Sequence, residues 1–200
     1  MVVTRLGLLK AEPRPEAIAE RNKMIALHLL ASALVSYAVI SFVEYVVHRT
    51  FMHHMRLATR FGSDFLKQLC RNHMSLHHKK SYKHSSAHDE QDDLRWQVSL
   101  AGFLPNVLIC FALTCLDPLT GAMMFCVGTV YGIVWWAVHN EMHRQEGRTF
   151  AGNALFRYIE RRHQLHHQFP KTNYNLLLPL WDWIFATEAP RQQKRKQTAG

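Results

Sequence analysis

Three long apolar runs limit what this chain can fold into. Each is about 20 residues long and carries no formal charge, and they occupy residues 24–43, 96–116 and 118–138. A helix of this length measures about 30 Å, which matches the hydrocarbon thickness of a bilayer. One such run could be a buried helix of a soluble core, but three of them in 200 residues favour membrane spans. We therefore expect an all-α integral membrane protein with about three membrane-spanning helices.

The segments between the runs predict the topology. Only Asp117 separates the second run from the third, and the surrounding sequence LDPLTG is typical of a tight turn, so these runs should form a helical hairpin. Of the 24 lysines and arginines, 9 lie in residues 49–95 and 10 in residues 140–200. The positive-inside rule places both polar segments in the cytoplasm. The N-terminus is then outside if the first run spans the membrane fully, and inside if that run inserts only partly.

The cysteines and the basic tail do not indicate a further functional site. Cys70, Cys110, Cys115 and Cys126 form no CxxC pair, and they look like small buried hydrophobes rather than a disulfide framework or a zinc ribbon. The last ten residues, RQQKRKQTAG, form a basic tail in a chain with a net charge of +9. This tail indicates at most a modest attraction to anionic lipid head groups. We expect no nucleic-acid partner.

Histidines carry the strongest functional signal. Four groups lie close to the ends of the apolar runs or in the polar segments, and they comprise His48, His53 and His54, then His73, His77 and His78, then His139 and His143, and finally His163, His166 and His167. His84 and His88 form a further pair, and His28 stands alone near the start of the first run. The four groups can converge on one layer beneath the bilayer. We expect this layer to be a cytoplasmic histidine-rich helical cap.

The spacing of these histidines indicates metal ligands. Residues three or four apart share a face of a helix, so His73 and His77 can aim at one point, as can His139 and His143. The last group has i, i+3, i+4 spacing and should lie on one stripe. Neutral imidazole is the commonest metal ligand in proteins.

Two spacings point to more than one ion. His48 and His53 are five residues apart, so they either serve different metals or the helix loosens between them. The adjacent His77 and His78 point about 100° apart on an ideal helix and could reach two ions. About ten converging imidazoles are more than one ion can use, so the sequence predicts two neighbouring metals.

The motifs HRTFMHH, NHMSLHH and RHQLHH resemble the histidine boxes of the fatty acid hydroxylase and sterol desaturase superfamily of integral-membrane di-iron enzymes. They stand in the same order as in that family, and TNYNLLLPLWDWIFAT is similar to the family's segment after the final box, so the resemblance spans residues 44–187. It implies two iron ions, O2 as co-substrate, and ten metal ligands. These are His48, His53, His73, His77, His78, His139, His143, His163, His166 and His167.

The apolar runs and the resemblance together divide the chain. We expect an N-terminal polar tail at residues 1–23, a membrane di-iron hydroxylase domain at 24–188 and a basic C-terminal tail at 189–200. Five further residues are candidates for supporting the ligands from outside the ligand set: His54, His84, His88, Glu141 and Glu160. For the two glutamates, a solvated charge is the alternative.

The activity implied is the O2-dependent hydroxylation or desaturation of an unactivated C–H bond. The substrate would be a membrane lipid such as a fatty acyl chain or a sterol-like lipid, and the electrons would come from an external ferredoxin or cytochrome with its reductase. Two positions depart from the family pattern, since Asn175 replaces a frequent Gly and Trp183 a frequent basic residue. Both lie near the expected substrate entrance, so they bear on the substrate more than on the metals.

Three alternatives remain at this stage. YGIVWWAVHNEMHR also resembles bacterial carotenoid ring hydroxylases, although the HxxxHH second box and the LWDWIFAT ending favour an acyl-lipid or sterol-like substrate. A membrane metalloprotease would need HExxH, which HNEMH does not provide. A non-enzymatic metal transporter or store would place ionisable residues at the membrane midplane, whereas these histidines follow the ends of the runs.

Overall fold

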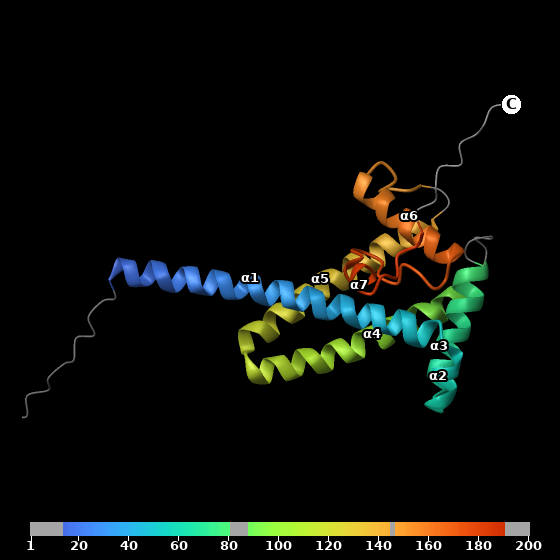
Figure 1. Cartoon of the computed structure of the whole chain (residues 1–200), viewed down its shortest axis with the longest axis horizontal. Helices are drawn as coiled ribbons and strands as arrows, with labels where there is room; N and C mark the ends of the chain where they lie inside the picture. The colour runs from blue at the N-terminus through green and yellow to red at the C-terminus, as the bar shows by residue number, and fades with distance from the viewer. Residues whose placement is uncertain (1–13, 81–87, 145–146, 191–200) are drawn as a thin grey trace, which may run out of the picture.

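The computed structural model describes residues 14–80, 88–144 and 147–190, without the side chains of residues 79–80 and 88–95. Within these ranges the chain is helical and contains no strand. The long helix α1 (Pro15–Val46) continues into a π-helical segment, η1 (Val47–Met52), and lies beside the hairpin of α4 (His88–Leu116) and α5 (Pro118–His143), as Figure 1 shows.

Three helices are long and apolar enough to cross a membrane, at residues 15–52, 96–116 and 118–143. This confirms the three spans expected from the sequence. The first helix begins at Pro15, nine residues before the apolar run, because proline suits the first turn of a helix and Glu16 complements its N-terminal dipole. Part of the segment expected to be a polar tail is therefore a helical extension of the first span.

The hairpin turn between α4 and α5 is fixed by short-range contacts. The Asp117 carboxylate caps α5 by accepting from the backbone N–H groups of Leu119 at 3.2 Å and Thr120 at 3.3 Å. Gly121 allows the helices to approach closely, since a Cβ there would lie 2.1 Å from the Thr114 hydroxyl oxygen. His28 Nε2 lies 2.8 Å from the Asp117 carboxylate and so ties α1 to the turn.

Buried apolar side chains join α1 to its neighbours in two places. Ile40, Met124, Tyr131 and Leu177 pack together between α1, α5 and the C-terminal segment. Val43, Val47 and Met52 pack with Leu69 where η1 meets α3 (Asp64–Asn72). The short helix α2 (Met55–Arg60) precedes α3, and a second π-helical segment, η2 (His73–Lys80), follows it. The second group of contacts places η1 and η2 at the same end of the spans.

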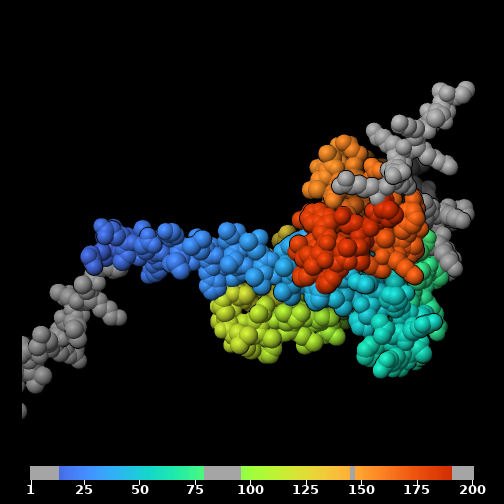
Figure 2. Space-filling model, viewed as in Figure 1, coloured from blue at the N-terminus to red at the C-terminus, as the bar shows by residue number. Residues whose placement is uncertain are grey.

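The C-terminal part of the chain returns to the first span. Helix α6 (Ala154–Gln168) leads through an irregular segment to the short α7 (Leu180–Ile184), which lies against α1 in the space-filling view (Figure 2). The Trp181 indole N–H donates to the carbonyl of Ala38 at 3.0 Å, and its ring packs on Phe42 with centroids 4.6 Å apart. The segment between α6 and α7 is therefore held between the histidine-rich end and the first span.

Candidate metal centre

The structure assembles all ten histidines expected as ligands at one end of the spans. One cluster, called cluster A, contains His48, His53, His73 and His166, and the other, called cluster B, contains His77, His139, His143 and His163. Within each cluster, one ring nitrogen of every residue lies within 4.8 Å of the others. His78 and His167 complete the set. His78 Nε2 lies 3.2 Å from His73 Nε2 beside cluster A, and His167 Nε2 lies 3.0 Å from His163 Nε2 beside cluster B.

Two π-helical segments and the residue that follows the first of them supply three of the four cluster A histidines, and also His78 beside the cluster. His48 and His53 are five residues apart along η1 and its end, and His73 and His78 are five apart in η2. Because backbone hydrogen bonds in a π-helix join residues five apart instead of four, the wider turn brings side chains at this spacing toward one face. The helix therefore loosens between His48 and His53, and both join one cluster, which is the second of the two alternatives left open by the sequence.

Helical spacing alone misassigned some partners. His73 and His77 do not aim at one point, because η2 is π-helical and places His77 in cluster B. His139 and His143 do share a cluster, as expected for a regular α-helix. On α6, the stripe of three histidines faces both clusters, with His166 in cluster A, His163 in cluster B and His167 beside cluster B. The two clusters are therefore adjacent, with His73 and His77 rings 5.0 Å apart.

The nitrogen positions fit a bound cation. His73 Nε2 lies 3.1 Å from His53 Nε2 and 3.2 Å from His48 Nε2 and His78 Nε2. A neutral imidazole has one N–H, so His73 cannot donate to all three, and lone pairs would otherwise face one another. Two imidazoles at right angles around a metal, with bonds of about 2.1 Å, have nitrogens about 3.0 Å apart. His166 Nε2 is also buried without a hydrogen-bond partner, as expected for a ligand atom.

Backbone carbonyls fix the orientation of two cluster A histidines. His48 Nδ1 lies 2.7 Å from the carbonyl oxygen of Tyr174, and His166 Nδ1 lies 2.6 Å from that of Thr172. Because a carbonyl can only accept, both Nδ1 atoms carry the proton and both Nε2 atoms present a lone pair. Metal-binding histidines in proteins are commonly held in this way.

The imidazoles outside the spans are held neutral by their surroundings. Burial, together with repulsion from neighbouring imidazoles, lowers the pKa of His53 and of His167 to about 2. The same causes lower the pKa of His78 to about 3, and burial lowers the pKa of His166 to about 4. Neutral rings are the form that binds metals, so at neutral pH these histidines are ready to serve as ligands.

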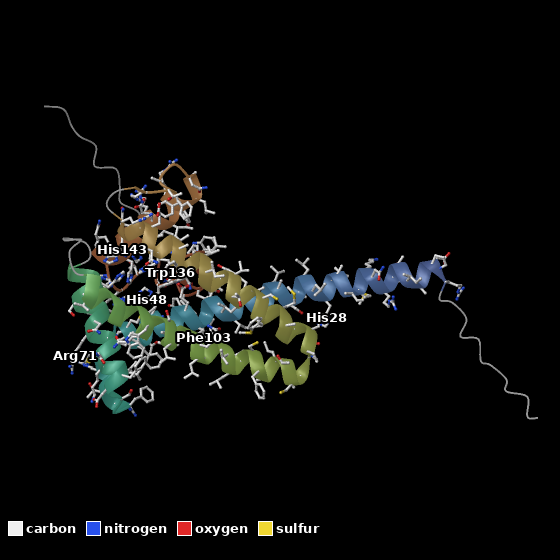
Figure 3. The ribbon with its side chains drawn as sticks, turned by 180° about the vertical axis from the view of Figure 1, so that it is seen from behind. His28, His48, Arg71, Phe103, Trp136 and His143 are labelled. Atoms are coloured by element: carbon white, nitrogen blue, oxygen red, sulfur yellow. The ribbon has the colours of Figure 1, made fainter. Side chains whose placement is uncertain are left out.

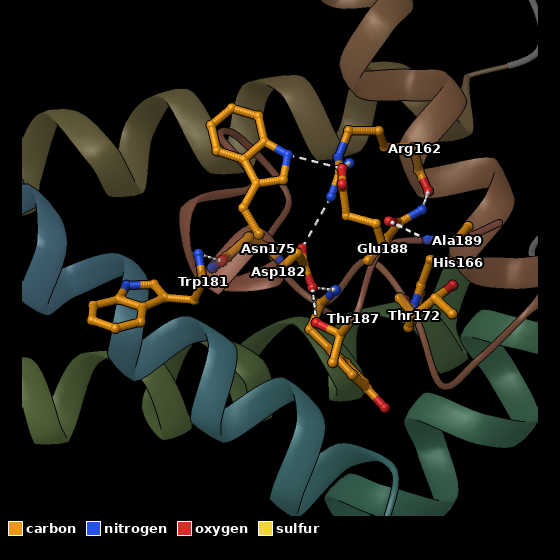
Figure 4. A network of polar contacts seen from close by, with 12 residues as sticks. Arg162, His166, Thr172, Asn175, Trp181, Asp182, Thr187, Glu188 and Ala189 are labelled. Atoms are coloured by element: carbon orange, nitrogen blue, oxygen red, sulfur yellow. Dashed lines mark hydrogen bonds and ion pairs between the residues drawn. The ribbon is translucent and has the colours of Figure 1, made fainter. Parts of the chain in front are cut away.

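A buried carboxylate holds the segment that carries the two carbonyls (Figure 4). Asp182 is fully buried and accepts from the backbone N–H groups of Tyr174 at 2.8 Å and Asn175 at 2.9 Å. It also accepts from the Thr187 hydroxyl at 2.7 Å and pairs with Arg162 at 3.1 Å. Arg162 directly precedes His163, so this network connects α6 and α7 to the metal centre. Sequence reasoning did not identify it, and the only signal was the likeness of the TNYN and LWDW stretches to the family segment.

The other site candidates lie outside the two clusters. His54 is exposed at the start of α2. Glu141 accepts from the backbone N–H groups of Thr149 and Phe150, and Glu160 pairs with Arg148, so the two glutamates organise the loop before α6. His84 and the side chain of His88 lie outside the described residues. A surface cavity of about 440 Å³ opens beside His53 and Arg71.

Figure 3 shows how the labelled histidines are distributed, with His48 and His143 at one end of the spans and His28 near the hairpin turn at the other.

The sequence profile named fatty acid hydroxylase matches residues 33–187, a region that includes both clusters and the segment between α6 and α7. No curated protein and no solved structure matches the chain. On the strength of that match over most of its length, the chain belongs to the fatty acid hydroxylase family, a family of hydroxylase- and desaturase-type lipid oxygenases.

Proposed function

We propose that this protein is an O2-dependent di-iron oxygenase that hydroxylates or desaturates an unactivated C–H bond of a membrane lipid. A fatty acyl chain or a sterol-like lipid is the substrate class that fits best. The observation that carries the proposal is the pair of adjoining histidine clusters at the end of three apolar spans, in a chain of this family. Ten imidazoles exceed what one ion can use, so the arrangement supports two metals.

The chain's own residues would hold and isolate the centre. Two iron ions bound there would use O2 and two electrons to oxidise the C–H bond, with at least one oxygen atom released as water. The carbonyls of Thr172 and Tyr174 orient two of the imidazoles, and burial keeps the rings neutral and limits water near them. His73, His77 and His166 are each 5% exposed or less.

The position of the clusters suits a lipid substrate and a water-soluble electron donor. The spans present apolar surface to the bilayer, so a lipid chain can approach the centre without leaving the membrane. We propose that this end faces the cytoplasm, because the two segments that contain the boxes hold 19 of the 24 lysines and arginines. An external ferredoxin or cytochrome with its reductase would then deliver electrons from that side.

The test combines metal content with product formation. Purified protein in detergent should contain about two ions per chain by elemental analysis. Membrane fractions supplied with O2 and a reducing system should convert a lipid to a hydroxylated or unsaturated product. The product is identified by mass spectrometry, and fractions from cells with the gene are compared with fractions from cells without it. His166→Ala should remove this product while the protein remains in the membrane. One ion or none in folded protein would contradict the di-iron proposal, and two ions without any O2-dependent lipid product would favour a metal transporter or store.

A further inference from the structure

Glu44 is a carboxylate placed inside the first membrane-spanning helix, four residues before His48. Its Oε1 accepts from the Trp135 indole N–H at 2.6 Å and from the backbone N–H of Leu176 at 3.2 Å. Its Oε2 accepts from the Tyr131 hydroxyl at 2.6 Å and from the Asn175 side-chain amide at 2.9 Å. A carboxylate offers about four lone-pair sites, and all four are used here. Glu44 therefore joins α1 to α5 and to the C-terminal segment through each of its oxygens.

One of these contacts leads to cluster B. The Trp135 ring stacks on His139, with ring centroids 4.7 Å apart and an angle of 21° between the planes. The hydrogen bond to Glu44 fixes the indole about its long axis, and the stacked indole in turn limits rotation of the His139 ring. Glu44 thus acts on a cluster B ligand through Trp135.

Another contact leads to cluster A. Asn175 and Leu176 directly follow Tyr174, whose carbonyl accepts from His48 Nδ1. The Tyr174 ring also packs against His48 and His53, with centroids 5.6 Å and 5.7 Å apart. A glycine at position 175 would lack the amide that reaches Glu44 and would leave the Leu176 backbone N–H as the remaining bond from this segment to the carboxylate. The connection to cluster A therefore depends partly on the Asn175 side chain.

We propose that Glu44 is a positioning residue that holds ligands of both metals at once, through Asn175 and Leu176 on one side and Trp135 on the other. The proposal rests on the proposed function, since it assumes two bound ions. Charged groups inside membrane spans are costly and are usually retained for a function. Glu44 belongs to neither histidine cluster, so this function would be to position the ligands. Loss of a residue that orients metal ligands typically lowers metal affinity about 10- to 100-fold.

The test measures how fast each ion leaves folded protein. Purified protein loaded with Co(II) is mixed with a chelator, and release is followed by absorption. His53→Ala and His143→Ala, which each remove a ligand of one cluster, assign the release phases to cluster A and cluster B. Glu44→Gln keeps the shape but replaces two acceptor sites by an NH2 group that faces donors. We expect it to accelerate both phases about 10-fold or more, with a circular dichroism spectrum like that of the wild type.

Two milder variants separate positioning from stability. Trp135→Phe and Tyr131→Phe each remove one donor to Glu44, but only Trp135 stacks on a cluster histidine in the described contacts. Trp135→Phe should accelerate release from cluster B alone, and Tyr131→Phe should leave both phases near the wild-type rates. Asp117→Asn, a carboxylate at the far end of the spans, should also leave them unchanged.

The outcomes distinguish this inference from the proposed function. Wild-type protein that holds fewer than two ions would contradict the proposed function and the inference with it. Two ions in the wild type, with unchanged release in Glu44→Gln, would overturn the inference alone. Equal effects of Trp135→Phe and Tyr131→Phe would do the same, and that comparison stands even if Glu44→Gln does not fold.

Discussion

His77 and His78 are neighbours in the chain but face different metal clusters. Their rings are nearly perpendicular, at 89°, with centroids 5.7 Å apart. His77 packs against His143 at 4.7 Å in cluster B, and His78 Nε2 approaches His73 Nε2 to 3.2 Å beside cluster A. The segment η2 thus lies between the two clusters and supplies both.

This relationship predicts different losses for adjacent substitutions. His77→Ala should weaken metal binding at cluster B, and His78→Ala at cluster A, because each removes an imidazole from only one cluster. Both variants should abolish lipid oxidation, since an incomplete centre cannot bind and activate O2 at two metals. The measurement is Co(II) content and absorption in detergent-solubilised protein, with His143→Ala and His53→Ala as references for each cluster. Identical spectra for the two adjacent variants would show that η2 serves one site only.

Much of the architecture followed from the sequence because the signals were local. Uncharged runs of about 20 residues predict spans from length and polarity alone, and the tight turn at Asp117 joins two of them. The histidine boxes were visible for the same reason, since ligands from one segment repeat at short spacing. What failed was the assignment of His73 and His77 to one point, because nothing in the local sequence showed that His73–Lys80 forms a π-helix rather than an α-helix.

The polar networks around the boxes could not be predicted in this way. Asn175 reaches Glu44 and the carbonyl of Ser41 across more than 130 residues of sequence, and no periodicity encodes such a contact. Glu44 itself gave one usable signal, since a carboxylate directly after an apolar run invites the question of what neutralises or binds it. Asp182 is the only charged residue of the apolar stretch 174–187, but nothing in that stretch indicates that its partner is Arg162, 20 residues earlier in the chain.

Removal of the buried Asp182 carboxylate should lower the free energy of unfolding more than removal of the exposed Glu188 carboxylate. Arg162 pairs with the fully buried Asp182 and with Glu188, which is 46% exposed. Asp182→Ala leaves a buried guanidinium without this partner and should reduce the free energy of unfolding by about 3–5 kcal/mol. Glu188→Ala should cost less than about 1 kcal/mol. Thermal unfolding in one detergent compares the two, and equal losses would mean that the buried pair does not hold the segment at residues 172–176.

The metal-free protein should lose stability in mild acid. Burial lowers the pKa of His53 and His167 to about 2 and of His78 to about 3, against an ordinary value of 6.5. Below pH 6.5 the unfolded chain therefore binds more protons than the folded chain, so the free energy of unfolding falls as the pH falls toward the folded pKa values. Each such group contributes up to about 1.4 kcal/mol per pH unit.

The measurement is the Tm of chelator-treated protein at pH 7.5 and pH 5.5. We expect a lower Tm at pH 5.5, and a smaller difference in His78→Asn, which removes one of the titrating groups. A Tm that does not change between these pH values would mean that the rings are already solvated in the metal-free state.

The two ends of the spans should be accessible from opposite sides of the membrane. Gln68 on α3 and Thr149 before α6 are exposed near the clusters, whereas Glu16 lies at the start of α1, beyond the His28–Asp117 contact at the hairpin turn. In intact cells, a membrane-impermeant thiol reagent should label Glu16→Cys, and it should reach Gln68→Cys and Thr149→Cys only after the membrane is opened. The unsubstituted chain, whose own cysteines lie in the spans or are buried, provides the background. If positions 68 and 149 label from opposite sides, the histidine boxes are separated by the membrane and cannot form a shared centre. If both positions label from outside, the shared centre stands, and only the side from which electrons are delivered is reversed.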